Sequence, residues 1–263
     1  MPTSARHARN VLIALALLVA AALSFAACSD AGGTSGTPQA SGTSIAGDVT
    51  PPPDDSEHVS IVIVDEELIL DGHLFGRSNT VGVILSHMRP NDQTAWYPFA
   101  QRLADEGYAA LTFDFRGYGA SQGEVDYAKL DDDLREAVRF MQVDRGLDTV
   151  FLVGASMGAT TSLVVAAEAD VAGVVAVSPP AEFEDQKALA ALPDVQAPAL
   201  LIASEGDAPS LRFDELLDAG GSSVESKLYL GNAHGTALFD PTNEHSEAIQ
   251  ELILKFLHAH GGP

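Results

Sequence analysis

The fold is decided by the stretch TVFLV-GASMG-ATTSL, residues 149–163. Its first five residues form an apolar run of strand length, and its last five continue as a helix. Between them stands the pattern G-x-S-x-G, with Ser156 at its centre. In this setting the two glycines permit a sharp, strained turn that pushes the serine hydroxyl into the open. The stretch therefore predicts a nucleophilic serine at the carboxyl end of a buried strand.

A serine hydroxyl becomes a good nucleophile when a base lies within hydrogen-bond reach and an acid orients that base. Two later strands lead into such residues. The apolar run 199–203 is followed by Ser-Glu-Gly-Asp, ending at Asp207, and the run 228–230 is followed by Gly-Asn-Ala-His, ending at His234. Because reactive groups of open α/β sheets lie just past the carboxyl ends of strands, we expect Ser156, Asp207 and His234 to meet there.

The residues around this set leave alternatives open. Glu205 is two residues from Asp207 and is a second candidate for the acid. Three other histidines also follow Asp207 in the chain, as His234 does: His245, His258 and His260. Two more precede Ser156 and so do not fit the order Ser156, Asp207, His234: His73 and His87. No spacing of His, Cys, Asp and Glu indicates a metal site, and no phosphate-cradling glycine loop is present, so we expect no cofactor.

Short apolar runs alternate with helical stripes from residue 58 onward. The runs that we expect to be strands are 59–64, 67–70, 81–86, 109–113, 149–153, 171–177, 199–203 and 224–230. The later runs are rich in Val, Ile, Leu and Ala with little alternation, as strands covered on both faces are. Stripes at helical spacing lie between them. The pattern predicts an α/β fold, with a mostly parallel sheet and helices on both faces.

The segment that joins two of the expected strands, from Val177 to Ala199, has only 21 residues between its ends. It holds one short helical pattern, from about Glu182 to Leu192. We therefore expect no large cap domain over the site, and a shallow, accessible opening. Such a site suits short acyl esters, or the exposed ends of larger molecules, better than long chains.

Residues from about 60 to 260 resemble an α/β-hydrolase-fold serine hydrolase, of the esterase and dienelactone-hydrolase-like kind. Two segments carry the resemblance beside the G-x-S-x-G turn and the order Ser, Asp, His. The segment His87-Met88-Arg89-Pro90 matches the family's H-G-x oxyanion loop, with Met88 where the family usually has Gly. The segment DFRGYGAS, residues 114–121, matches the family's D-x-R-G-x-G-x-S segment.

The resemblance assigns catalytic roles to three residues. Ser156 would attack an acyl carbonyl, and His234 would take the proton of the serine and pass it to the leaving group. Asp207 would fix the histidine tautomer and stabilise the imidazolium.

The resemblance also implies an oxyanion hole. The backbone N–H of Met157 would supply one donor and the loop at His87 the other, with the N–H of Arg89 preferred over that of Met88. The other polar residues of the two matching segments are expected to be structural: His87 as a brace of the oxyanion loop, Asp114 and Arg116 as a bracing pair, and Ser121 as part of its turn.

The amino-terminal part of the chain has the build of an export signal. Residues 1–27 contain Arg6 and Arg9 and end in a seventeen-residue run without charge. The run ends in Phe-Ala-Ala-Cys, which resembles a bacterial lipoprotein lipobox, in which the cysteine becomes the lipidated first residue. That residue is Cys28, the single cysteine of the chain, so an intrachain disulfide is excluded. We expect an exported protein that lipid on Cys28 anchors to the cell membrane.

Composition also sets the domain boundaries. Residues 28–57 hold the cysteine and a run of Gly, Ser, Thr, Pro, Ala and Asp with little to bury, which indicates a flexible tether. Residues 58–263 form the expected hydrolase domain. The chain carries 14 Lys and Arg against 37 Asp and Glu, a net charge of −23, which argues against a nucleic-acid partner.

The expected function is hydrolysis of carboxylic esters, of small molecules or of exposed acyl groups, through an acyl-enzyme. Two alternatives stay open. An envelope serine peptidase would use the same chemistry on a different leaving group, and a non-catalytic binding lipoprotein would keep only the scaffold. The sequence does not predict an oligomeric state.

Overall fold

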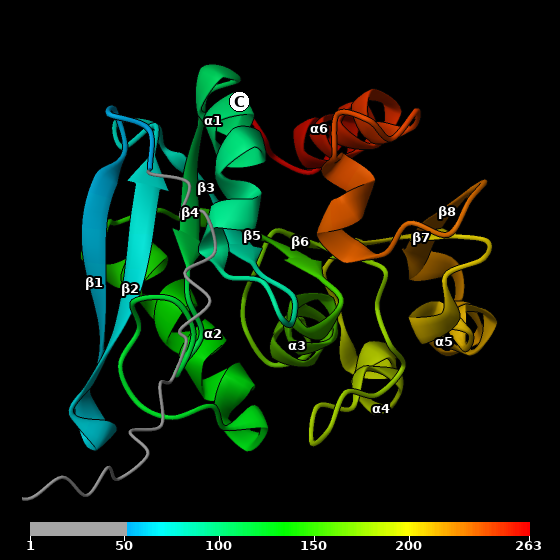
Figure 1. Ribbon diagram of the computed structural model, residues 1–263, viewed down its shortest axis with the longest axis horizontal. Helices are drawn as coiled ribbons and strands as arrows, with labels where there is room; N and C mark the ends of the chain where they lie inside the picture. The colour runs from blue at the N-terminus through cyan, green and yellow to red at the C-terminus, as the bar shows by residue number, and fades with distance from the viewer. Residues whose placement is uncertain (1–51) are drawn as a thin grey trace, which may run out of the picture. The chain divides into compact units, whose positions relative to one another are not determined.

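The computed structural model describes residues 52–263, which build one eight-stranded sheet of order β1-β2-β4-β3-β5-β6-β7-β8 (Figure 1). The strands are β1 (Glu57–Ile63), β2 (Leu68–Phe75), β3 (Val81–Ser86), β4 (Tyr108–Phe113), β5 (Thr149–Ala155), β6 (Gly173–Val177), β7 (Ala199–Ser204) and β8 (Val224–Tyr229). The β1–β2 and β2–β4 pairs are antiparallel, and all other pairs are parallel. The eight expected strands and the mostly parallel sheet are therefore confirmed.

Helices cover both faces of the sheet, as predicted. Within residues 52–263 the α-helices are α1 (Tyr97–Asp105), α2 (Leu130–Arg139), α3 (Met157–Ala166), α4 (Ala188–Ala191), α5 (Phe213–Gly220) and α6 (Ser246–Ala259). In Figure 1, α1 and α6 lie on one side of the sheet, and α2, α3 and α5 lie on the other. Two separate apolar cores match these two layers, one with Phe99 and Ile253 and the other with Leu134 and Leu163.

The central strand β5 shows why the apolar runs are continuous. Leu152 packs into the core under α2 and α3, and its neighbour Val153 packs into the core under α1 and α6; both side chains are fully buried. A strand buried on both faces has no solvent-facing positions, so it needs no polar alternation. Because the carboxyl ends of the parallel strands share one edge, the loops after β3, β5, β7 and β8 converge there.

The segment between β6 and β7 contains no large cap domain, as predicted, but its expected helix is wrong in extent. The α-helix of this segment covers only Ala188–Ala191 instead of the expected range from Glu182 to Leu192. The reason is a tight turn, in which the N–H of Phe183 donates to the carbonyl of Gln186 at 2.9 Å and the N–H of Gln186 donates back at 2.8 Å. Backbone groups used in this way are lost to a helix.

The amino-terminal predictions concern residues that the structure does not describe. The expected signal at 1–27, Cys28 and most of the expected tether lie outside the described residues. Among the helices of residues 52–263, none has the length and apolar character needed to cross a membrane. Export and lipid anchoring therefore stay predictions.

Candidate active site

Ser156 occupies a strained turn between β5 and α3. Its backbone has φ 47° and ψ −111°, a conformation that residues with a Cβ rarely adopt, and it is the residue just before the helix. The flanking glycines make the turn possible. A Cβ on Gly154 would lie 2.3 Å from the carbonyl oxygen of Gly158, and a Cβ on Gly158 would lie 2.3 Å from the carbonyl oxygen of Ser86. Both glycines are therefore needed for close backbone packing around the serine.

The structure brings His234 to Ser156 from the loop after β8. The Nε2 atom of His234 lies 2.7 Å from the Oγ atom of Ser156, although the two residues are 78 positions apart. On the other side of the ring, Nδ1 lies 2.9 Å from each carboxylate oxygen of Asp207. The tautomer with hydrogen on Nδ1 satisfies both contacts, because it donates to Asp207 and leaves Nε2 free to accept the serine hydroxyl.

Asp207 is held in place behind the histidine. It follows β7, its side chain is 1% exposed, and Ser210 Oγ donates to its Oδ2 atom at 3.0 Å. The alternative acid, Glu205, is exposed to solvent. Asp207 is therefore the acid that the structure places behind His234.

The alternative histidines lie elsewhere in the fold, each against an aromatic ring. The rings concerned are Tyr229 for His245, Tyr108 for His258, Phe256 for His260 and Tyr97 for His73. His245 and His260 belong to the ends of α6. Of the histidines considered for the base, His234 is therefore the one that the structure places at Ser156.

His87 braces the loop that follows β3, as predicted. Its ring is fully buried; Nδ1 donates to the carbonyl of Met88 at 3.1 Å, and Nε2 accepts from the N–H of Phe115 at 3.1 Å. Burial lowers the pKa of His87, so the ring stays neutral. The far end of the loop is fixed as well, because the N–H of Gln93 donates to Asp114 at 2.8 Å.

The predicted bracing pair of Asp114 and Arg116 is wrong, because each side chain has other partners. Asp114 accepts from Gln93 and from the N–H of Ala120. Burial raises the pKa of the Asp114 carboxyl. Arg116 instead binds the fully buried Asp133 at 2.6 Å. Both residues are structural, as expected, but they brace different parts of the chain.

Ser121 and Arg116 tie this segment to β1 and β2. Ser121 Oγ donates to the carbonyl of Asp114 at 2.5 Å and accepts from the N–H of Asp71 at 2.8 Å. Arg116 adds a contact to Glu66 at 2.8 Å, in the connection between the first two strands. The structural role predicted for Ser121 follows from these bonds.

The expected oxyanion donors lie at the two loops beside Ser156. Met157 is the first residue of α3, and the first N–H groups of a helix have no partner within it. Its N–H is therefore available to a ligand. The side chain of Arg89 donates through Nη1 to the phenol oxygen of Tyr127 at 3.3 Å. The choice between the backbone N–H groups of Arg89 and Met88 stays a prediction.

Met88, which replaces the usual glycine, contacts the loop that carries His234. Its Sδ atom accepts from the N–H and from the hydroxyl of Thr236, both at 3.3 Å. A Cβ on Gly235 would lie 2.4 Å from this sulfur, so the glycine makes room for it. The loop after β3 and the loop of His234 are thus in direct contact through the side chain of Met88, a contact that the sequence did not predict.

Two further residues near the histidine were not predicted. Ser178, just after β6, has a positive φ of 53°, and its Oγ accepts from the N–H of Gly235 at 3.0 Å. Asn91 donates to the Thr236 hydroxyl at 3.1 Å. The position of Ser178 directly past a strand, in front of two prolines, was a usable signal; Asn91 and Thr236 carried none, because they are 145 residues apart.

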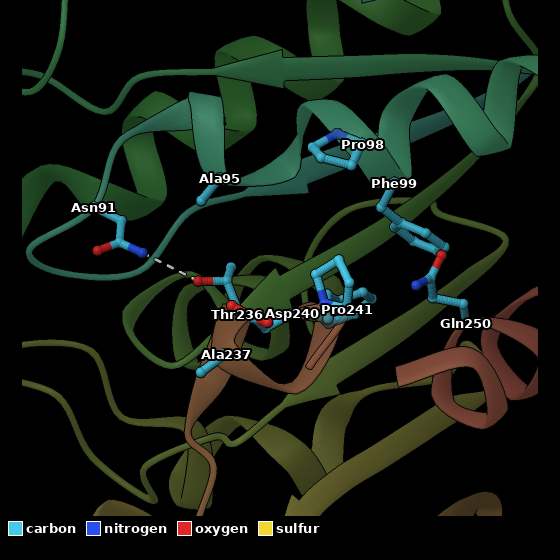
Figure 2. Close-up of a pocket in the computed structure, with 10 residues that line it drawn as sticks. Asn91, Ala95, Pro98, Phe99, Thr236, Ala237, Asp240, Pro241 and Gln250 are labelled. Carbon is cyan, nitrogen blue, oxygen red and sulfur yellow. Dashed lines mark hydrogen bonds between the residues drawn. The ribbon is translucent and has the colours of Figure 1, made fainter. Parts of the chain in front are cut away.

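A cavity of about 370 Å³ lies beside these loops, on the α1 and α6 side (Figure 2). Figure 2 shows the Asn91–Thr236 hydrogen bond at one end of it and Gln250 at the other. The lining is mostly apolar and includes Phe99, Phe239 and Pro241, but neither Ser156 nor His234. The cavity therefore adjoins the loop that follows His234 without including the serine.

Comparison with known proteins agrees with this geometry. Residues 81–212, half of the chain, match the family described as serine aminopeptidase, S33. The chain belongs to this family. Because the family is one of α/β-hydrolases, the protein is a serine hydrolase of the α/β-hydrolase superfamily. The matched residues include Ser156 and Asp207 and end before His234.

Individual relatives are more distant. The uncharacterized protein YfhR of Escherichia coli O157:H7 is 29% identical over 97 residues, which is 36% of this chain; the match spans about a third of that protein, 34%. Among solved structures, an esterase of Pyrococcus furiosus superposes with a TM-score of 0.65 at 19% identity, over 78% of this chain and 91% of its own. A proline iminopeptidase of Mycobacterium smegmatis superposes with a TM-score of 0.63 at 14% identity, over 78% of this chain and 98% of its own. These similarities show the fold.

In residues 52–263, no group of three or more His, Cys, Asp and Glu side chains is arranged to hold a metal ion. The site offers the hydroxyl of Ser156, the imidazole of His234, the carboxylate of Asp207 and the N–H of Met157. Groups of these types in this arrangement can act as nucleophile, base, orienting acid and hydrogen-bond donor to an anion.

Proposed function

We propose that this serine hydrolase cleaves carboxylic esters through an acyl-enzyme formed on Ser156. The observation that carries the proposal is the line of contacts from the Ser156 Oγ atom to His234 at 2.7 Å and from His234 to Asp207 at 2.9 Å. Each distance is within the range of a hydrogen bond that can pass or orient a proton. The strained backbone at Ser156 supports the same role, since such strain clusters at active sites.

The reaction has two halves of the same form. In the first, Ser156 Oγ attacks the ester carbonyl carbon while His234 Nε2 takes the hydroxyl proton. The tetrahedral intermediate then breaks its bond to the alcohol oxygen, which receives that proton and leaves. In the second, His234 takes a proton from water, the hydroxide attacks the acyl carbon, and the proton returns to Ser156 as the carboxylic acid leaves. Asp207 stabilises the imidazolium that forms in both halves.

The negative oxygen of each intermediate needs donors that are already in place. The N–H of Met157, at the start of α3, is one, and the partial positive charge of the helix amino terminus adds to it. We assign the second to the N–H of Arg89, with Met88 as the alternative. One such donor typically contributes about 2.7 to 4 kcal/mol to the transition state.

The short connection between β6 and β7, which carries no cap domain, supports an ester substrate with a short acyl group. The α-helix of this segment has four residues, so the segment supplies no domain that could enclose the acyl chain. A shallow site offers little binding energy to distort a stable amide, whereas an ester has a better leaving group. The family description favours a second candidate, an aminopeptidase, because the same residues would act on an amide.

The two candidates are separated by their leaving groups. We expect p-nitrophenyl acetate to be cleaved with a kcat/KM at least roughly a hundredfold above that of aminoacyl p-nitroanilides, and Ser156→Ala to abolish the cleavage. The reverse preference would identify a peptidase. Wild-type protein that is folded and cleaves neither would support the non-catalytic binding lipoprotein.

We also propose that the protein acts outside the cytoplasm, held at the membrane by lipid on Cys28. The proposal rests on the uncharged run before that residue and on the polar tether after it. Cells fed an alkynyl fatty acid should incorporate it into the wild-type chain and leave Cys28→Ser unlabelled. Equal labelling of both chains, or recovery of wild type in the cytoplasm, would contradict it.

A further inference from the structure

Strand β8 is an open edge of the sheet. It lies at the right-hand end of the sheet in Figure 1, next to β7 and with no strand beyond it in the described residues. Its four residues 225–228 are all exposed. At the opposite edge, β1 alternates buried and exposed side chains, with Val59, Ile61 and Ile63 in the core. The edge at β8 is thus uncovered on both faces along most of its length.

The free hydrogen-bonding groups of this edge belong to alternate residues. The carbonyl of Tyr229 accepts from the N–H of Glu205, just past β7, at 2.9 Å, so the backbone groups of Tyr229 face β7. Along a strand these groups point to one side and then to the other. Val224, Ser226 and Leu228 therefore direct their N–H and C=O groups to the open side.

We propose that β8 pairs antiparallel with β8 of a second copy of this chain, about a two-fold axis at Ser226. Ser226 then lies opposite the partner's Ser226, and the two exchange a pair of backbone hydrogen bonds. Glu225 lies opposite the partner's Lys227, and Lys227 opposite the partner's Glu225. Val224 lies opposite the partner's Leu228. Such an interface is isologous, since each contact occurs twice.

Charge selects this register. Two other registers are centred on residues whose backbone groups face the open side, Val224 and Leu228. In neither register does Glu225 of one copy lie opposite Lys227 of the other. Registers centred on Glu225 or on Lys227 set like charges opposite each other, which destabilises a pair of strands. The pairing centred on Ser226 is the one that joins opposite charges on both sides of the axis.

Lys227 also explains why the occupant is a second copy. A lysine on an edge strand hinders pairing with strands that place no carboxylate opposite it. Within the described residues its ammonium has no salt bridge, and it lies 5.5 Å from the centre of the Tyr229 ring. A second β8 supplies the missing carboxylate, and it covers Leu228, which is 42% exposed. The edge therefore discriminates for its own sequence.

The interface is small, so we expect a weak dimer. Five residues of each strand, 224–228, lie opposite each other and bury less area than a standard interface, which suggests a roughly micromolar dissociation constant. Anchoring of two copies on one membrane would raise their effective concentration and favour the pairing.

Charge reversal tests the pairing, because Glu225 of each copy lies opposite Lys227 of the other. Mature chain 28–263 with Cys28→Ser is studied by sedimentation equilibrium over roughly 1 to 200 µM. Wild type should dimerise. Lys227→Glu and Glu225→Lys should each weaken the dimer by about tenfold or more, since two unlike pairs become like pairs. The double variant should recover wild-type association, because both pairs are restored in reverse.

A crosslink gives a second, independent readout. Ser226→Cys in the same background places two thiols across the axis, and a short bismaleimide should join them. Ser60→Cys, an exposed serine on the other edge strand, is the matched control and should remain monomeric on a denaturing gel. Monomeric wild type over the whole concentration range, or a double variant as weak as the single ones, would overturn the proposal.

Discussion

Replacing Asp207 with asparagine should disable His234 without disturbing the fold. The side chain is buried, nearly isosteric with asparagine, and bound on one side by Ser210 and on the other by His234. The Asp207→Asn variant would keep the shape of the site and lose the negative charge that stabilises the imidazolium. Because the imidazolium exists only as the reaction proceeds, the loss should fall on kcat and leave KM nearly unchanged.

The size of the effect follows from the geometry. Nδ1 lies 2.9 Å from both carboxylate oxygens, so the two charge centres are about 4 Å apart. At an effective dielectric constant of about 20, opposite charges at that distance attract by about 4 kcal/mol. Since each 1.36 kcal/mol changes a rate tenfold, kcat should fall roughly a thousandfold.

Two matched variants make this test specific. Glu205→Gln removes the alternative acid. Ser210→Ala removes one hydroxyl hydrogen bond to the Asp207 carboxylate but leaves its charge. Each variant should keep kcat within about tenfold of wild type. Ester cleavage and urea unfolding are measured for all three. If Asp207→Asn stays within tenfold of wild type, or if Glu205→Gln loses the activity instead, the assignment of the acid is refuted.

The remaining predictions concern the frame of the site. Gly158→Ala should lower the free energy of unfolding by about 1 to 3 kcal/mol and abolish ester cleavage, because its Cβ would lie 2.3 Å from the Ser86 carbonyl oxygen. A variant that keeps full ester cleavage and unfolds at the same urea concentration as wild type would contradict this. Arg116→Met leaves Asp133 buried and unpaired, so the free energy of unfolding should fall by about 3 to 5 kcal/mol. The control Arg139→Met, at the surface, should change the free energy of unfolding by less than about 1 kcal/mol. Equal effects of the two variants in thermal unfolding would contradict the burial argument. The pKa of His87 is lowered in the folded chain, so the stability that its neutral ring contributes is present above its unfolded pKa near 6.5 and is lost as the pH falls. Nitrogen-15 NMR should show a neutral ring with hydrogen on Nδ1 at about pH 6. A charged ring there would refute the bracing role.

The sheet and the meeting of Ser156, Asp207 and His234 could be predicted because their signals are largely local. The runs at β5 and β7 are apolar throughout, since both faces of these strands are buried, and each leads directly into Ser156 or Asp207. The order Ser, Asp, His along the chain and the resemblance to a hydrolase family then selected these three residues from the alternatives.

Two errors arose where partners are distant in sequence. Arg116 pairs with Asp133 across two elements, and nothing in the segment DFRGYGAS indicates that carboxylate. The contact of Met88 with Thr236 spans 148 residues and depends on two loops meeting above the sheet. Both contacts are properties of the assembled fold. A third error is local: the helix expected from Glu182 begins only at Ala188, because the turn between Phe183 and Gln186 uses backbone groups that the longer helix would need.

The central claim is that Ser156 is an activated nucleophile, and a fluorophosphonate probe tests it most directly. Wild type, Ser156→Ala and His234→Ala are treated in parallel and analysed by intact mass and peptide mapping. The account predicts a single adduct on Ser156 in wild type, no adduct in Ser156→Ala, and strongly slowed labelling in His234→Ala. Folded wild type that takes up no probe, or an adduct that persists in Ser156→Ala, would contradict it.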